Sequence, residues 1–115
     1  AAEQGDAYAQ YNLGLMYGNV KRVTQNYKTA VKWYTLAAEQ GLSEAQYNLA
    51  NNYYHGRGVI QDNIYAHMWW NITAASGIQG AVKNRNIVAK KMTPSDISAA
   101  QKLASECVAK NYKGC

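Results

Sequence analysis

Histidine and cysteine are the residue types that most often carry chemistry, and the chain contains two of each. His55 and His67 stand twelve positions apart, and neither has a cysteine or a carboxylate beside it at the spacing of metal ligands. Because a zinc site requires about four converging nitrogen or sulfur ligands, we expect no metal site. The serines, lysines and carboxylates show no nucleophile–base pairing, and the sequence has no Gly-rich phosphate loop. The sequence therefore predicts no catalytic residues and no cofactor. His55 is expected to close a loop or line a groove, and His67 to lie on a helix surface.

The two cysteines, Cys107 and Cys115, are close enough in the sequence to form a disulfide. Cys107 continues an apolar stripe, and residues 112–114 allow the chain to reverse so that Cys115 approaches it. We predict a bridge, which places the protein in a periplasm or outside the cell, because disulfides persist in oxidising compartments. The alternative is a buried free thiol and a separate thiol in the tail, as in a cytoplasmic protein.

Amides, phenols and lysines recur along the chain and could bind a peptide. Asn12, Asn48 and Asn84 stand 36 residues apart, so parallel helices would present them side by side. Such side chains could bind a peptide backbone or a terminal carboxylate. Alternatively, they bond to the adjacent helix or to water, an interpretation that we favour for Asn12 and Asn48. The candidate groove residues are Tyr11, Asn12, Leu15, Tyr47, Asn48, Asn51, Asn52, His55, Lys83 and Asn84, with Ile87, Lys90 and Lys91 on the same face.

This spacing belongs to an internal repeat. Residues 1–5 return as 37–41, residues 9–13 return as 45–49, and 15 of the 36 aligned positions are identical. A period of this length is typical of stacked helical arrays. The predicted organisation is a single solenoid domain, with the end of a preceding repeat and repeat one in residues 1–41, repeat two in 42–77, and a degenerate repeat with a C-terminal cap in 78–115.

Each repeat is predicted to form two helices. The second helices carry apolar residues at the i, i+3, i+4, i+7, i+8 spacing of one buried face. These residues are Ala30, Trp33, Tyr34, Ala37 and Ala38 in repeat one, and Ala66, Trp69, Trp70, Thr73 and Ala74 in repeat two. The first helices carry Ala9, Leu13, Met16 and Tyr17, then Ala45, Leu49 and Tyr53, with Gly14 and Ala50 leaving room for a close neighbour. No period-two alternation is sustained, so the predicted class is all-α.

Capping residues mark the ends of these helices. Asn26 and Asp62 stand ahead of the second helices and can accept hydrogen bonds from their free N–H groups, while Gly41 and Gly77 end them in a left-handed turn. In the third unit, residues 78–91 hold Arg85 where the earlier units have leucine. A final helix is predicted to begin at residues 93–96 and to bury one stripe. That stripe is Ile97, Ala100, Leu103, Ala104, Cys107 and Val108.

Composition excludes several classes of protein. The 115 residues are 48% hydrophobic and 17% charged, which is typical of a folded domain, and no stretch is long and apolar enough to cross a membrane. The net charge is +5, and residues 73–115 carry seven Lys or Arg against two Asp or Glu. This excess falls short of the dense basic stripe of a nucleic-acid binder, so nucleic-acid binding is only a third hypothesis.

The repeat resembles a known family. The residues that carry the resemblance are Ala45, Leu49, Ala50, Tyr53, Gly56, Arg57, Gly58, Val59, Asp62, Ala66, Trp69, Trp70, Ala74 and Gly77, with equivalents in 9–41. On these residues the chain is similar to the Sel1-like repeats, a branch of the tetratricopeptide-like helical solenoids. The resemblance implies a right-handed α/α superhelical solenoid of antiparallel helix pairs. In repeat one, the glycine loop is replaced by residues 20–23, which lack both glycines.

The resemblance also implies a function. Members of the family resemble one another in acting as adaptors that hold protein complexes together, in bacteria often outside the cytoplasm. The leading hypothesis is therefore a non-enzymatic module that binds a peptide or protein in a concave groove rich in Tyr and Asn. The alternative is a penicillin-binding protein or a hydrolase of β-lactams or peptidoglycan, like some cysteine-rich relatives, although this chain lacks their paired cysteines. Because residues 1–5 match the end of a second helix, we also expect an exposed apolar N-terminal edge that drives self-association.

Overall fold

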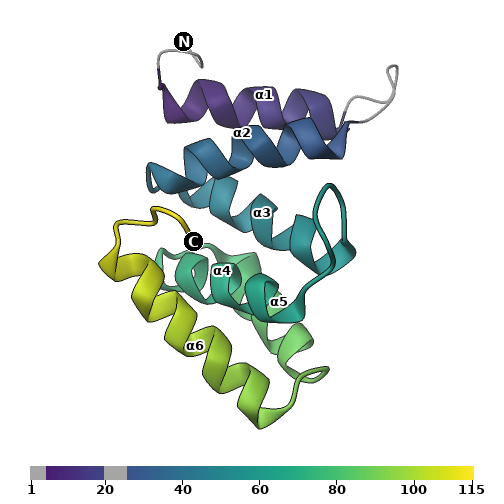
Figure 1. Ribbon diagram of the computed structural model, residues 1–115, viewed down its shortest axis with the longest axis vertical. Coiled ribbons are helices and arrows are strands. Elements are labelled where there is room, and N and C mark those ends of the chain that lie inside the picture. Colours follow the sequence, from purple (N-terminus) through teal and green to yellow (C-terminus); the bar gives the residue numbers. More distant parts are fainter. Residues whose placement is uncertain (1–4, 20–25) are drawn as a thin grey trace.

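The computed structural model describes residues 5–19 and 26–115, which form six α-helices and no strand (Figure 1). The helices are α1 (Ala7–Asn19), α2 (Tyr27–Glu39), α3 (Ser43–His55), α4 (Asn63–Ala75), α5 (Gln79–Ala89) and α6 (Pro94–Ala109). The predicted all-α class is confirmed. The expectations that concern residues 1–4 and the loop at residues 20–23 lie outside the described residues.

Helices α1 to α5 pack successively against one another in a molecule measuring 40 × 29 × 23 Å (Figure 1). The two closest pairs are α1 with α2 and α3 with α4, which correspond to the two repeats, and α2 packs on α3 to join them. Short connections turn the chain back after each helix, so neighbouring helices are antiparallel. The result is an α/α solenoid.

The third unit departs from this pattern, because α6 packs on α4 instead of forming a close pair with α5 (Figure 1). The first helix of repeat two buries Leu49, whereas α5 has Arg85 at the equivalent position. The Arg85 guanidinium donates a hydrogen bond of 3.1 Å to the Asn71 side chain of α4. Because this position of α5 holds a charged residue and not a leucine, it offers α6 no apolar contact. The α6 helix packs on α4 instead.

The predicted caps are confirmed. The Asn26 side chain accepts a hydrogen bond from the Thr29 N–H, and the Asp62 carboxylate accepts from the first turn of α4. Gly41 and Gly77 have φ values of 88° and 92°, the left-handed conformation in which a side chain would be strained. The α6 helix begins with a capping box in which Thr93 and Asp96 satisfy each other's backbone N–H groups.

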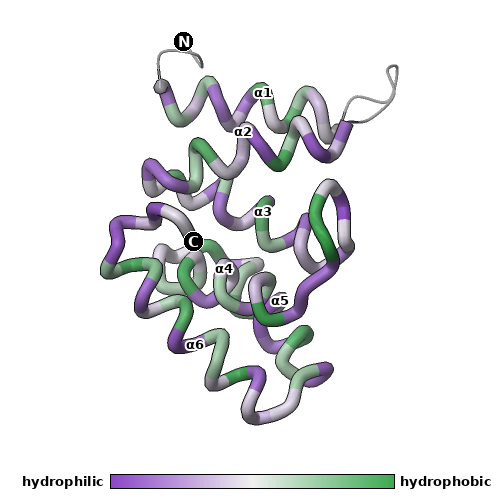
Figure 2. Tube along the Cα trace, in the orientation of Figure 1, coloured by the Kyte–Doolittle hydropathy of each residue, from purple (hydrophilic) through white to green (hydrophobic). Residues whose placement is uncertain are grey.

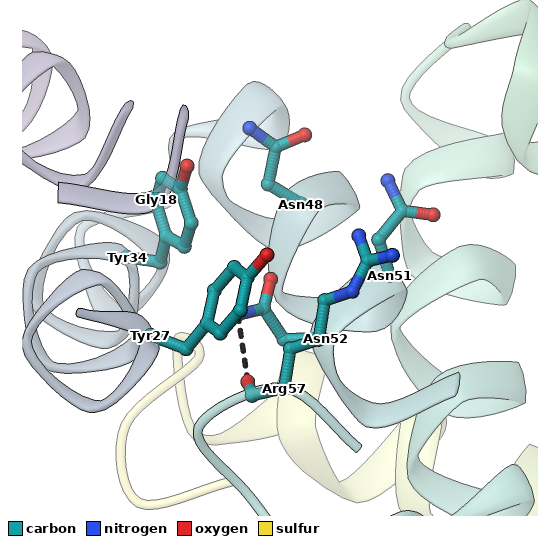
Figure 3. Close-up of a pocket in the computed structure, with 7 residues that line it drawn as sticks. All are labelled: Gly18, Tyr27, Tyr34, Asn48, Asn51, Asn52 and Arg57. Carbon is teal, nitrogen blue, oxygen red and sulfur yellow. Dashed lines mark hydrogen bonds between the residues drawn. The ribbon is translucent and has the colours of Figure 1, made fainter. Parts of the chain in front are cut away.

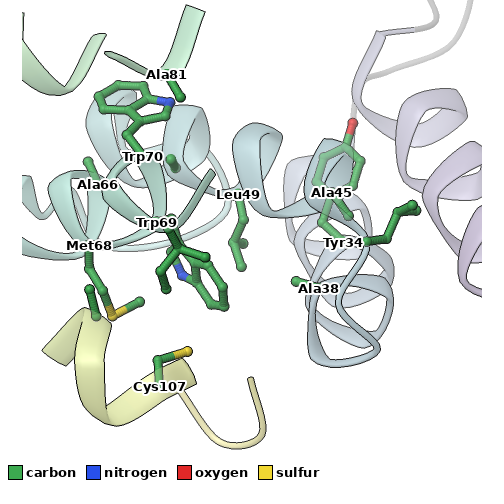
Figure 4. Close-up of a cluster of buried hydrophobic side chains, with 14 of the residues drawn as sticks. Tyr34, Ala38, Ala45, Leu49, Ala66, Met68, Trp69, Trp70, Ala81 and Cys107 are labelled. Carbon is green, nitrogen blue, oxygen red and sulfur yellow. The ribbon is translucent and has the colours of Figure 1, made fainter. Parts of the chain in front are cut away.

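The core combines small residues between α2 and α3 with large ones around α4. Ala38 and Ala45 are fully buried, which lets these two helices approach closely (Figure 4). Around α4, Trp70 lies beside Ala81 of α5, and Met68 points toward α6 (Figure 4). Because α3, α5 and α6 all contact α4, this helix is buried on most of its circumference. The other helices keep a hydrophilic side (Figure 2).

Several predicted core positions are more exposed than the apolar spacing implied. Met16 and Tyr17 of α1 are 50% and 39% exposed, because α2 is the one described helix that packs extensively on α1. Trp33 is half-buried although α2 packs on both α1 and α3, and Val108 is 49% exposed at the end of the α6 stripe. The prediction that these four residues are buried was therefore wrong, since burial depends on which neighbours cover a stripe.

A disulfide joins Cys107 of α6 to Cys115 and returns the C-terminal segment toward the first repeat. The Tyr112 ring lies over Gly41, where a Cβ would sit 3.4 Å from a ring carbon. The Gly114 N–H donates a hydrogen bond of 3.0 Å to the Glu39 carboxylate. The tail therefore connects the end of α6 to the turn between α2 and α3.

We expect reduction of this disulfide to lower the free energy of unfolding by about 2–3 kcal/mol, because the bridge closes a loop of about nine residues and restricts the unfolded chain. Urea unfolding with and without a thiol reductant measures the change. The Cys107→Ser, Cys115→Ser double variant is the matched control, since its urea midpoint should not respond to reductant. An unchanged midpoint on reduction of the wild type contradicts the prediction.

Candidate functional site

A pocket of about 120 Å³ with a polar lining lies between α2 and α3 (Figure 3). It lies where repeat one meets repeat two, and it is open to solvent. Amide, phenol and guanidinium groups dominate its wall, which suits a polar ligand better than an apolar one. The lining residues are Gly18, Tyr27, Tyr34, Asn48, Asn51, Asn52 and Arg57.

Tyr34 and Asn48 form the inner wall of the pocket. The Asn48 side chain acts on the hydroxyls of both Tyr34 and Tyr11 of α1. Burial raises the pKa of the Tyr34 hydroxyl, and Asn48 opposes this shift. Gly14 of α1 makes room for the Tyr34 ring, because a Cβ there would lie 2.5 Å from two ring carbons. Because burial raises its pKa, the Tyr34 hydroxyl remains protonated and neutral at physiological pH.

The outer wall depends on the loop after α3. The buried Asn52 side chain donates a hydrogen bond of 2.9 Å to the Arg57 carbonyl and thereby holds the loop. Gly58 has a φ of 78° and packs directly on the backbone of Tyr27. The Arg57 guanidinium lies 5.7 Å from the centre of the Tyr27 ring, a cation–π geometry, and extends beside Asn51 (Figure 3).

A hydrogen bond between an asparagine and a tyrosine joins repeat two to α5. The Asn84 side chain donates a hydrogen bond of 2.9 Å to the Tyr47 hydroxyl, and Gly80 leaves room for that hydroxyl. Tyr47 and Asn84 stand 36 residues after Tyr11 and Asn48, so the two pairs occupy equivalent positions. The hydrogen bond between Asn84 and Tyr47 connects the first helix of repeat two to the first helix of the third unit.

Cationic groups surround the end of α3 beside the pocket. Burial lowers the pKa of His55, and the charges of Arg57 and Lys91 lower it further. Lys91 donates to the Tyr54 hydroxyl and stays close to that ring. Glu44 lies in the first turn of α3, at the opposite end of the helix. The electrostatic field near Arg57 is therefore positive.

The remaining predicted groove residues do not join this pocket. Leu15 packs against the hydrophobic core, whereas Asn12, Lys83 and His55 are exposed on α1, α5 and α3 respectively. Sequence reasoning missed Tyr27, Tyr34 and Arg57 as parts of the site. The glycines flanking Arg57 could have indicated a tight loop, but the packing of that loop on α2 had no signal in the sequence.

His67 does not lie on a helix surface as predicted. It is 3% exposed, and its Nδ1 has no hydrogen-bond partner in the described part of the chain. Burial lowers the pKa of this imidazole, and the Arg85 charge lowers it further. The prediction was wrong because α5 and α6 pack on α4 and cover it. The sequence of α4 alone does not indicate this packing. Within residues 5–19 and 26–115, no three His, Cys, Asp or Glu side chains gather as metal ligands would.

Stacked antiparallel helix pairs with a period of 36 residues define the tetratricopeptide-like class of α/α repeat proteins. The chain belongs to the Sel1 repeat family, whose model matches residues 7–42 and 43–78. This family generally comprises non-catalytic scaffolds for protein interaction. No sequence among curated proteins matches the chain. None of the helices that the structure describes could span a membrane.

Two solved structures are similar to the chain. The first is c5321, a protective antigen of uropathogenic Escherichia coli strains that displays an SLR fold, with 35% identity and a TM-score of 0.89 over 96% of this chain. The second is a Sel1 repeat protein from Oxalobacter formigenes, with 36% identity and a TM-score of 0.69 over 74% of this chain. The chain spans 24% of the length of the first protein and 64% of the second.

Proposed function

We propose that the chain is a non-enzymatic adaptor module that binds a peptide or protein segment along α3 and its neighbours. The observation that carries this proposal is the polar pocket between α2 and α3, which contains Asn48, Asn51 and Asn52. Framework asparagines bond within the protein, but the Asn51 amide has no such contact among the described residues and stays available to a ligand. Membership in a family of interaction scaffolds supports the same function.

A pull-down from an extract of the source organism tests this proposal. We expect the Asn51→Ala variant to lose a partner that the wild type retains, because the variant removes amide groups from the pocket without removing a core contact. Gln101→Ala on the exposed side of α6 is the matched control and should retain the partner. Equal capture by both variants and the wild type would show that binding does not involve the pocket.

The hydrolase alternative requires a covalent step on a serine. Labelling with a fluorescent penicillin distinguishes it from the adaptor function. We propose that no label attaches to the native chain. A labelled serine that survives denaturation would overturn the non-enzymatic proposal.

We further propose that the exposed apolar side chains of α1 support self-association. Tyr8 and Met16 are exposed on α1, on which α2 alone of the described helices packs extensively, and exposed apolar groups promote association. We expect the weight-average mass in sedimentation equilibrium to rise with concentration, and the Tyr8→Ser, Met16→Ser double variant to abolish the rise. Ile60→Ser is the matched control, since Ile60 is an exposed apolar residue on the loop after α3 and not on α1. A monomer at every concentration contradicts this prediction.

The Cys107–Cys115 bridge supports a periplasmic or secreted location, which we propose for this chain. Mass measurement of protein isolated from its native compartment under non-reducing conditions tests the location. Two alkylatable thiols in that material would contradict both the bridge and the proposed compartment.

A further inference from the structure

Arg57 is the one charged residue among the seven that line the pocket. No carboxylate of the described residues pairs with its guanidinium, which contacts the Tyr27 ring instead. A ring contact from the side leaves the N–H edges of a guanidinium free to donate. The pocket therefore presents a cation whose hydrogen-bonding capacity the protein leaves unused.

The groups next to Arg57 are neutral hydrogen-bonding groups. The Asn51 side chain extends from α3 beside the guanidinium (Figure 3). On the other side, the Asn52 amide is already committed to the Arg57 carbonyl, so it holds the loop rather than a ligand. Asn51 and Arg57 thus form a pair of hydrogen-bond donors in a pocket that the Tyr34 and Tyr27 rings also line.

The surrounding charges have the same sign as Arg57. Burial lowers the pKa of His55, and Lys91 and Arg57 lower it further, so the imidazole is uncharged at neutral pH and these two cations lie near the end of α3. Asp62, the acidic residue that follows this loop, is committed to the N-terminus of α4 through two backbone N–H groups. An anion that enters the pocket from solvent therefore meets a positive field.

We propose that this pocket binds a carboxylate of the partner segment, which accepts hydrogen bonds from the Arg57 guanidinium and the Asn51 amide. The inference rests on the proposed function and specifies the chemistry that the partner presents. A guanidinium and a carboxylate are both planar and match in a two-point contact. A single cation balances the single charge of a carboxylate, and a cavity of about 120 Å³ accommodates one such group.

Two sources can supply the carboxylate, namely an acidic side chain and a peptide C-terminus. Three acetylated alanine-rich hexapeptides separate them. The first contains one glutamate and ends in an amide, the second contains glutamine and ends in a free carboxylate, and the third contains glutamine and ends in an amide. Binding of each to the isotope-labelled chain is followed by NMR through the Asn51 side-chain amide and the Arg57 Nε–H signals.

We expect the first or second peptide, or both, to shift these signals, and the neutral peptide to leave them in place. Whichever peptide acts identifies the source of the carboxylate. The Arg57→Gln variant should bind the acting peptide about threefold to tenfold more weakly, as expected for a charged hydrogen bond near the surface. Lys102→Gln on the exposed side of α6 removes the same charge elsewhere and should change the affinity little.

Three results would overturn the proposal. They are equal shifts with the neutral peptide, no shift of the pocket signals with either acidic peptide, and unchanged affinity in the Arg57→Gln variant. Each of these leaves the adaptor function intact if the pull-down still shows a partner that depends on Asn51. Loss of that dependence in the pull-down, by contrast, removes the proposed function itself.

Discussion

Replacing Trp69 with alanine is expected to lower the free energy of unfolding by about 3–5 kcal/mol. Trp69 is 3% exposed and lies between Leu49 of α3 and Cys107 of α6 (Figure 4). Its removal leaves a cavity that the three surrounding helices cannot close, because each is held by other contacts. Urea unfolding followed by circular dichroism measures the loss.

Trp33 provides the matched control for this prediction. It occupies the equivalent position in repeat one, 36 residues earlier, but it is half-buried and its ring is covered on one side by the Lys32 ammonium at 5.3 Å. We expect Trp33→Ala to cost about 1–2 kcal/mol, since less apolar area returns to water on unfolding. Equal losses for the two variants would mean that the α6 covering of α4 contributes nothing to stability.

The Gly58→Ala variant is expected to lose about 3–4 kcal/mol of stability and the pocket with it. A Cβ at this position would lie 2.3 Å from the Tyr27 carbonyl oxygen and 2.5 Å from its carbon, and the φ of 78° already disfavours a side chain. Backbone atoms on α2 cannot rotate aside as a side chain can. The loop must therefore lift away from Tyr27, which separates Arg57 from its neighbours in the pocket.

Gly18→Ala is the control, because Gly18 also lines the pocket but tolerates a methyl group. A Cβ there would make ordinary contacts at 3.5 Å from the Ala30 Cβ and 3.6 Å from the Tyr34 hydroxyl. Alanine in a helix is favoured over glycine by up to about 1 kcal/mol, so stability should stay equal or rise. Thermal unfolding and partner capture compare the two variants; a Gly58→Ala protein as stable as Gly18→Ala would contradict the predicted loop contact.

Local residue patterns were enough to predict the helices and their ends. Asn26 and Asp62 bond to backbone groups two or three residues away, so their capping role depends on sequence neighbours alone. The capping box at Thr93 and Asp96 and the left-handed turn at Gly41 are equally local. The period of 36 residues also predicted the repeated pairing of helices, since equal sequences bury equal faces.

The candidate site was only partly predictable. Asn48, Asn51 and Asn52 share the α3 helix, and their spacing predicts a common polar face. Tyr27 and Arg57 come from a different helix and a loop, and they meet only because Gly58 packs on α2. No local pattern encodes that contact, since it depends on the distance between two repeats.

The amino-acid sequence by itself determined the all-α class, the repeat, the caps and the pairing of α1 with α2 and α3 with α4. The tertiary structure decided which identical residues became buried. Trp33 and Trp69 have the same local context, yet only Trp69 is enclosed, because α6 turned onto α4 and not onto α5. His67 of α4 is buried for the same reason. Periodicity identifies the apolar side of a helix. Which neighbouring helix covers that side depends on how all the helices of the folded chain pack together.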